Sequence, residues 1–115
     1  MVNVHKQIMS TLNTILPTYY ELFCDSTTAV PCITYMESSN YAIDEGETLG
    51  YSRVGFTVKV WDTNIAHAQT IAESVDSKLR KLGFKRTSSN ELHFNNNIQK
   101  ILTYEGLGLE TFSNN

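Results

Sequence analysis

Few residues of this chain have types and spacings that could support catalysis or metal binding. The three histidines, His5, His67 and His93, lie far apart, and neither they nor the two cysteines, Cys24 and Cys32, form a C-x-x-C, H-E-x-x-H or mixed Cys/His ligand pattern. The chain also lacks a P-loop, a G-x-G-x-x-G turn and a G-x-S-x-G nucleophile motif. Nothing in the spacing of Cys32 and the histidines favours a nucleophile–base pair. We therefore expect no catalytic residue, no metal or cofactor site and no enzyme activity.

Two clusters of charged residues remain as candidate sites, and both would act by binding. The acidic cluster consists of Glu37, Asp44, Glu45 and Glu47. The basic cluster consists of Lys78, Arg80, Lys81, Lys85 and Arg86. Each can be a solvated surface without a function. Alternatively, the acidic cluster repels DNA or docks a basic partner, and the basic cluster contacts a neighbouring subunit. A head-to-tail contact between the two clusters would close into a ring if the rotation between subunits allows it.

Length and composition indicate one domain with few surface charges. The chain has 115 residues, 41% of them hydrophobic and 18% charged, whereas a typical globular domain has about a quarter charged residues. The net charge of −3 does not favour general affinity for nucleic acid. The sequence shows no membrane-spanning run and no secretory signal, so we expect a protein made in the cytosol. We expect a single domain over residues 1–106 and a flexible tail over 107–115.

The first half of the chain predicts one helix and two strands. Apolar residues at spacings of three and four predict a helix over 3–16, which ends before Pro17. Residues 19–24 and 31–36 are aromatic and apolar enough to form strands. Residues 37–51 are polar and acidic and predict a long hairpin loop, with the alternative of strands that become ordered only in an assembly.

The second half predicts a strand, a long helix and a hairpin. Alternating apolar residues over 53–61 predict a strand, and Asp62, Thr63 or Asn64 caps the helix that follows. This helix ends at Gly83, and Phe84 can fold back onto its last turn. Residues 87–90 predict a loop, and 92–94 and 98–104 predict the strands of a final hairpin. The pattern therefore predicts an α+β domain, in which an antiparallel or mixed sheet of four to five strands packs against two helices on one face.

Four segments, in their order and spacing, resemble the tail terminator proteins of long-tailed siphophages. Pro31-Cys-Ile-Thr-Tyr35 is similar to a P-x-I-T-Y stretch of that family, and 56–61 is similar to its strand that ends in a tryptophan. The long helix from Ile65 to its Leu-Gly-Phe84 end and the hairpin over 92–104 resemble the family's later elements. The resemblance extends from about residue 3 to residue 106.

The resemblance implies a structural virion protein that forms a ring, hexameric in the family, on the end of the tail tube. Such a ring stops tube polymerisation and provides the attachment surface for the head. Its partners would be further copies of itself, the tail tube protein and a head-completion protein, and DNA would pass through its channel without sequence-specific binding. We expect it in the virion at the head-proximal end of the tail, and in the host cytoplasm during assembly. The chain is short for the family, which leaves open another head–tail connector or minor tail protein. A small cytoplasmic ligand-binding module is a third alternative.

Overall fold

The computed structural model of the chain describes residues 4–20, 30–42, 51–94 and 97–109. Within them, two helices and five strands follow in the order α1 (Val4–Asn13), β1 (Thr18–Tyr20), β2 (Cys32–Ala42), β3 (Tyr51–Asp62), α2 (Ile65–Lys81), β4 (Lys85–Phe94) and β5 (Asn97–Leu109). The strands form one sheet in the order β1-β2-β3-β5-β4. β1 runs parallel to β2, and the other neighbours are antiparallel. The predicted α+β architecture with a mixed sheet is confirmed.

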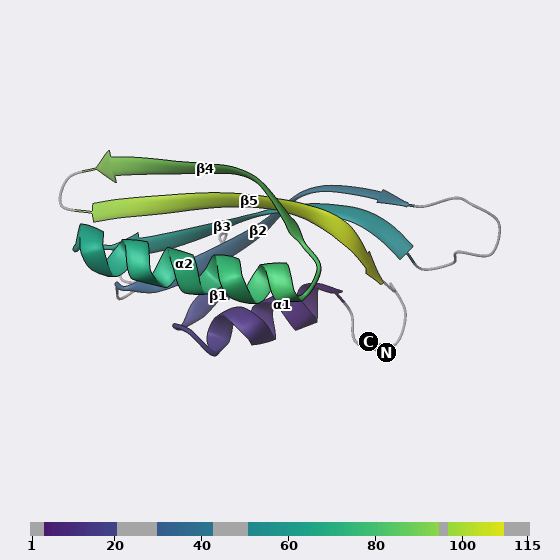
Figure 1. Cartoon of the computed structure of the whole chain (residues 1–115), viewed down its shortest axis with the longest axis horizontal. Coiled ribbons are helices and arrows are strands. Elements are labelled where there is room, and N and C mark those ends of the chain that lie inside the picture. Colours follow the sequence, from purple (N-terminus) through teal and green to yellow (C-terminus); the bar gives the residue numbers. More distant parts are fainter. Residues whose placement is uncertain (1–3, 21–29, 43–50, 95–96, 110–115) are drawn as a thin grey trace.

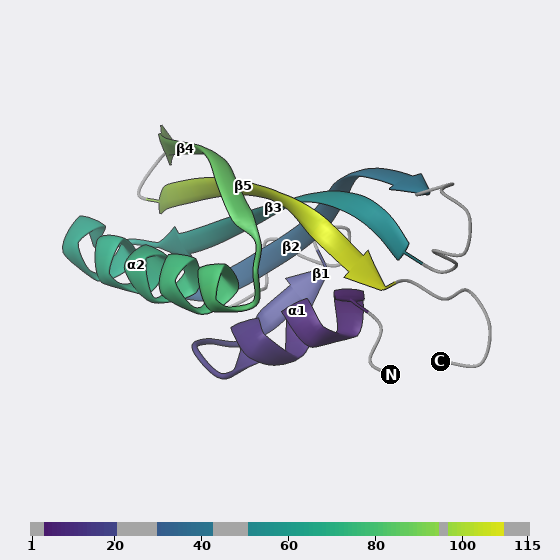
Figure 2. The same cartoon turned by 45° about the vertical axis from the view of Figure 1, so that its right-hand side comes forward.

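Both helices lie on the same face of the sheet (Figures 1 and 2). The alternation in β3 explains this arrangement, because Val54, Phe56, Val58 and Val60 point to the helices and are fully buried. Apolar residues of both helices complete the core, among them Ile8 and Leu12 of α1 and Val75 and Leu79 of α2. Neither described helix is long and apolar enough to cross a membrane.

Phe56 lies at the centre of a group of aromatic side chains in this core. Its ring stacks on Tyr104 of β5 with 5.5 Å between centroids, and it meets the edge of Phe84 at 5.0 Å. Tyr35 of β2 lies 5.6 Å away on another side. Aromatic pairs at these distances contribute beyond the area that they bury, so this group joins three strands to the end of α2.

The predicted ends of α2 are confirmed. Asn64 is the N-cap, and its side chain accepts a hydrogen bond from the backbone N–H of His67 at 2.9 Å. At the other end Gly83 has a φ of 99°, a left-handed conformation that glycine adopts without steric cost. The backbone N–H of Phe84 then donates to the carbonyl of Leu79 at 3.2 Å, which turns the chain back onto the helix.

α1 is shorter than predicted, because it ends at Asn13 and not near residue 16. After Asn13 the backbone tightens, with bonds from Thr14 N–H to Thr11 at 3.2 Å and from Ile15 N–H to Leu12 at 2.9 Å. These bonds span three residues, as in a 3₁₀ turn. The Asn13 side chain accepts from the backbone N–H of Thr18 at 3.1 Å and connects the helix end to β1.

Several strands are longer than predicted, because polar stretches that were expected to be loops pair with neighbouring strands. Residues 37–42 belong to β2 and Tyr51 to β3, so all of the described part of the expected loop 37–51 is strand, and 43–50 lie outside the described residues. Residues 87–90, expected to be a loop, belong to β4 and pair with β5. β5 continues to Leu109, three residues into the expected tail, and 110–115 lie outside the described residues. Of the predicted strand 19–24, β1 includes residues 19 and 20, and 21–24 are not described.

Candidate interaction surfaces

Of the acidic cluster, only Glu37 lies among the residues that the structure describes. It is on β2 and faces α1. Its carboxylate pairs with Nε2 of His5 at 2.7 Å, and the side chains are 30% and 26% exposed. The other ring nitrogen of His5 shares a hydrogen bond with the hydroxyl of Tyr35. Glu37 therefore fastens α1 to β2. Asp44, Glu45 and Glu47 lie outside the described residues.

The structure brings two members of the basic cluster together at one carboxylate. Oδ2 of Asp76, on α2, lies 3.0 Å from Nε of Arg80 and 3.4 Å from Nη1 of Arg86. Oδ1 of Asp76 accepts a hydrogen bond of 2.8 Å from the hydroxyl of Tyr104. Burial, and then the bond to Asp76, raises the pKa of Tyr104 far above its ordinary value of 10, so the hydroxyl remains a donor. Two arginines and a buried tyrosine thus share one aspartate.

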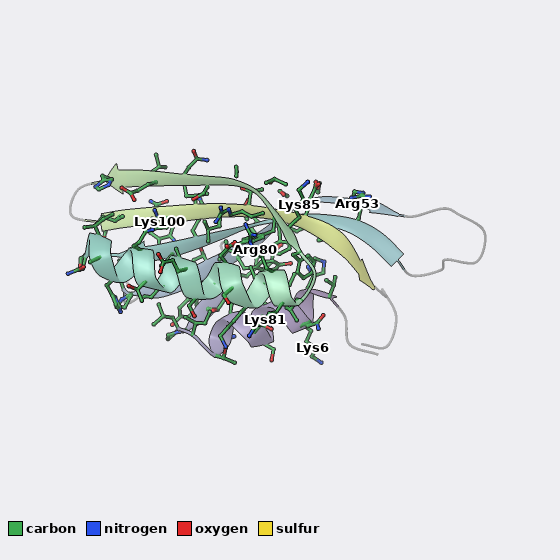
Figure 3. All side chains as sticks on the ribbon, in the orientation of Figure 1. Lys6, Arg53, Arg80, Lys81, Lys85 and Lys100 are labelled. Atoms are coloured by element: carbon green, nitrogen blue, oxygen red, sulfur yellow. The ribbon has the colours of Figure 1, made fainter. Side chains whose placement is uncertain are left out.

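The three lysines of the basic cluster point elsewhere. At 3.6 residues per turn, Lys78 and Lys81 lie on different sides of α2 from Arg80. Lys85 precedes Arg86 in β4, and successive residues of a strand face opposite sides of the sheet. Figure 3 shows Lys81 and Lys85 on opposite sides of α2. The basic cluster is therefore not one continuous patch.

A small hollow lies beside Arg86, between α2 and the strands β4 and β5. Its volume is about 90 Å³, and its lining consists of Gln69, Ala72, Glu73, Asp76, Arg86, Ser89, Lys100 and Leu102. Small-molecule sites usually have about 300–1,000 Å³. Lys100 pairs across the sheet with Glu91 at 3.1 Å, and its side chain is only 13% exposed. The hollow is too small for an ordinary ligand, and three of its charged residues, Asp76, Arg86 and Lys100, form ion pairs within the chain.

The other two histidines also contact carboxylates. His67 in the first turn of α2 contacts Asp62, whose other oxygen accepts from the backbone N–H groups of Thr63 at 2.7 Å and Asn64 at 3.1 Å. His93 bonds to Glu91 at 2.7 Å. This bond and the neighbouring Lys100 hold the pKa of Glu91 below its ordinary value. The contact of His67 with Asp62 connects α2 to β3, whereas that of His93 with Glu91 lies within β4.

The face of the sheet opposite the helices is mostly polar and bears no described helix. Thr57, Lys59 and Trp61 of β3 lie on it, alternating with the core residues. Trp61 is partly buried, and its indole N–H donates to the hydroxyl of Thr34 at 2.9 Å. Leu92 of β4 is 54% exposed on this face.

Sequence reasoning named Asp62 only as a possible helix cap and missed Asp76, and these two residues make most of these contacts. Asp76 stands four residues before Arg80, a spacing at which oppositely charged residues meet on a helix. That signal was available in the sequence. Arg86 and Tyr104, the other two partners of Asp76, lie on β4 and β5, and no local pattern predicts these contacts.

Comparison with models of known protein families and with curated proteins finds no match for this chain. Over the residues that the structure describes, no group of three or more His, Cys, Asp and Glu side chains is placed to hold a metal ion.

Proposed function

We propose that this chain is a tail terminator of a long-tailed siphophage, a structural virion protein whose ring caps the tail tube. In this proposal the ring stops tube polymerisation and offers the attachment surface for the head. Its partners are further copies of the chain, the tail tube protein and a head-completion protein. DNA passes through its channel, and the chain acts through its shape and contacts, not through catalysis.

The observation that carries the proposal is that the segments which resemble the family form one packed unit. Cys32 to Tyr35 of β2 pair directly with Val58 to Trp61 of β3. The Leu-Gly-Phe end of α2 places Phe84 against Phe56 of the same strand, and the final hairpin adds Tyr104 to this contact. Four separate local similarities would carry less weight if they were scattered over unrelated parts of the fold.

Two features of the described surface favour assembly over ligand binding. The hollow beside α2 has about 90 Å³, below the range of small-molecule sites, so this hollow does not favour a ligand-binding module. Arg80 is 57% exposed and Arg86 36% exposed, so charged groups remain at the surface for a protein partner. Another head–tail connector or minor tail protein would share these features, and tube binding distinguishes it from a terminator.

The first test measures the native mass of the purified chain across concentration, together with negative-stain images of the same samples. We expect a ring with an open channel, six-fold as in the family. The second test adds the chain to polymerising tail tube protein and measures tube length. A terminator binds one end and shortens the length distribution. A chain that forms rings but leaves the tubes unbound would be a connector, and a chain that does neither would overturn the proposal.

A further inference from the structure

We propose that two strand edges of this chain pair with each other between copies, the β5 edge over 106–109 of one copy and the β2 edge over 39–42 of the next. The inference rests on the proposed ring and names the contact that would join its subunits. In this contact a strand of one sheet adds to the edge of another through backbone hydrogen bonds. Both edges belong to strands that the structure describes.

The first argument is a row of the sheet at which the four long strands bend. β2 has a register shift directly after Glu37, and β4 has one directly after Arg86. These two residues belong to the same row of paired residues across the sheet. β3 and β5 contain glycines next to this row, Gly55 and Gly106. Bulges bend a strand and strand glycines often mark bends, and the strands curve near this row (Figures 1 and 2).

The second argument is that only three strands continue beyond this row. We call this part the arm, and it consists of residues 39–42 of β2, 51–55 of β3 and 105–109 of β5. The arm extends past the ends of α2 and β4 (Figures 1 and 2). Its pairing is regular, because neither register shift falls inside it. β2 and β5 are therefore the outer strands of a short regular sheet.

The third argument is that both outer strands of the arm are edges of the described sheet. β4 pairs with β5 no further than Glu105, and β1 pairs with β2 only over 33–35. Over 106–109 and 39–42 no described strand pairs with the outer side of the backbone. The N–H and C=O groups of such an edge are a template for a further strand.

The fourth argument is the composition of the two edges. The edge of β5 reads Gly106-Leu-Gly-Leu109 and that of β2 reads Ser39-Asn-Tyr-Ala42, and neither contains a charged residue or a proline. β4, the other long edge strand, has a bulge and the charged residues Lys85, Arg86 and Glu91, features that hinder pairing. The chain therefore protects β4 against pairing and has no such protection on the arm.

The direction of the strands decides how copies combine. β2 and β5 flank β3 and both run antiparallel to it, so they run in the same direction on opposite sides of the arm. Copies that stand side by side in one orientation therefore pair β5 of one with β2 of the next in parallel. This contact is heterologous, and it generates a ring when it closes. Pairing of β5 with β5 would instead be isologous and would stop at a dimer.

Proline variants test the contact at the backbone. Proline has no N–H, and adjacent residues of an edge strand direct their N–H groups alternately to the neighbouring strand and outward. Leu107→Pro and Gly108→Pro are made on β5, and Tyr41→Pro and Ala42→Pro on β2. From each pair we keep the variant whose circular dichroism melt matches that of the wild type, because its missing N–H is the one that faces outward.

Sedimentation at several concentrations measures the self-association of the β5 variant, of the β2 variant and of their equimolar mixture. We expect each variant alone to associate at least about ten-fold more weakly than the wild type, because the partner strand then lacks a donor for one of its carbonyls. The mixture should form dimers and nothing larger. The intact β2 edge of the first variant can pair only with the intact β5 edge of the second, and such a dimer has no intact edge left.

A matched control and a second measurement separate this contact from misfolding. Ser89→Pro or Asn90→Pro on β4, chosen by the same melt, should leave association within about two-fold of the wild type, since β4 lies outside the contact. Hydrogen exchange of the wild type serves if no proline variant folds. Outward-facing amides over 39–42 and 106–109 should exchange at least about ten-fold more slowly in the assembled chain than in the dilute chain.

A kept variant of β2 or β5 that associates like the wild type would overturn the proposal. A β2 variant that dimerises alone would overturn it too, because the contact would then be isologous. The same holds for an assembled chain whose arm amides exchange as in the dilute chain, and for a wild type that remains monomeric at every concentration. The tube-length assay keeps the proposed function separate. Folded edge variants that still shorten the tubes would leave the terminator intact and remove only this contact.

Discussion

β3 and β4 flank the same strand, β5, yet they are held in the sheet by different forces. Every helix-side residue of β3 from Val54 to Val60 is fully buried. The side chains of β4 from Lys85 to His93 are exposed on both faces, because α2 does not cover this edge strand. β3 is therefore stabilised mainly by burial of apolar surface. β4 depends on its hydrogen bonds to β5 and on polar pairs such as Lys100 with Glu91.

The difference explains how an exposed edge strand can remain free of unwanted pairing. β4 contains a register shift between Arg86 and Ser88, which places an extra residue in the strand. Bulges and charged residues on an edge strand hinder pairing with another sheet. Lys85, Arg86 and Glu91 supply such charges. β3 needs none of these devices because strands lie on both sides of it.

The largest expected effect tests the burial of β3. Phe56→Ala removes the ring that contacts Tyr35, Phe84 and Tyr104, and we expect it to lower the free energy of unfolding by about 3–5 kcal/mol. Leu92→Ala on β4 is the matched control, and its exposed side chain should cost within about 0.5 kcal/mol. Urea denaturation of both variants measures the contrast. Equal losses would show that the two strands contribute alike and would contradict the comparison.

A smaller effect tests how closely the core around β3 is packed where α2 ends. A Cβ on Gly106 would lie 2.7 Å from Cδ1 of Phe84, so Gly106→Ala should destabilise the fold by about 1–3 kcal/mol. The double variant with Phe84→Ala provides the control, because removal of the ring removes the clash. The cost of Gly106→Ala should therefore shrink markedly in that background. An unchanged cost would place its origin in the backbone and not in the contact with Phe84.

The sequence predicted the parts of the fold that burial dictates. The alternation over 53–61 and the apolar stripe of α2 report directly which side chains face the core, so β3, α2 and its caps were predicted. β4 was missed in part because Thr87-Ser-Ser-Asn90 has the composition of a loop. This polar edge strand forms because its backbone can hydrogen-bond to β5. Such pairing depends on the assembled sheet and not on the local composition of the segment.

The contacts of the charged residues, like β4, could be predicted from the sequence only in part. The sequence shows that Lys78, Arg80, Lys81, Lys85 and Arg86 are close in the chain, and the spacing of Asp76 and Arg80 indicates one helix contact, but no local pattern indicates that Arg86 joins it. Only the geometry of α2 and the pleat of β4 bring Arg80 and Arg86 to Asp76 and turn Lys85 to the other face. Tyr104, which donates to that aspartate, lies far away in the sequence and reaches it because α2 packs on the face of β5, and the pairing of β4 with β5 places Arg86 opposite Tyr104.

A third prediction concerns the polar contact that links the core to the side of β4. Tyr104→Phe keeps the stack on Phe56 but removes the hydroxyl that donates to Asp76, and we expect a loss of about 0.5–1.5 kcal/mol. Tyr19→Phe, at an exposed tyrosine of β1, should leave stability unchanged and serves as the control. Chemical denaturation compares the two variants. A loss from Tyr104→Phe as large as that from Phe56→Ala would mean that the polar contact, and not burial, dominates this part of the core.

The smallest effect concerns β4 alone and depends on pH. The bond to His93, and then Lys100, lowers the pKa of Glu91 below its ordinary value of 4.5, which means that its ionised form is favoured in the folded chain. A lowered folded-state pKa gives stability that is present above the pKa of the unfolded chain and is lost as the pH falls through the folded value. Glu91→Gln should therefore lower the melting temperature slightly at neutral pH, and the difference from the wild type should disappear in acid. The control is Glu73→Gln, at an exposed glutamate of α2 without an ion-pair partner among the described residues, which should show no such convergence. A deficit of Glu91→Gln that persists in acid would mean that the side chain stabilises β4 by packing and not by its charge.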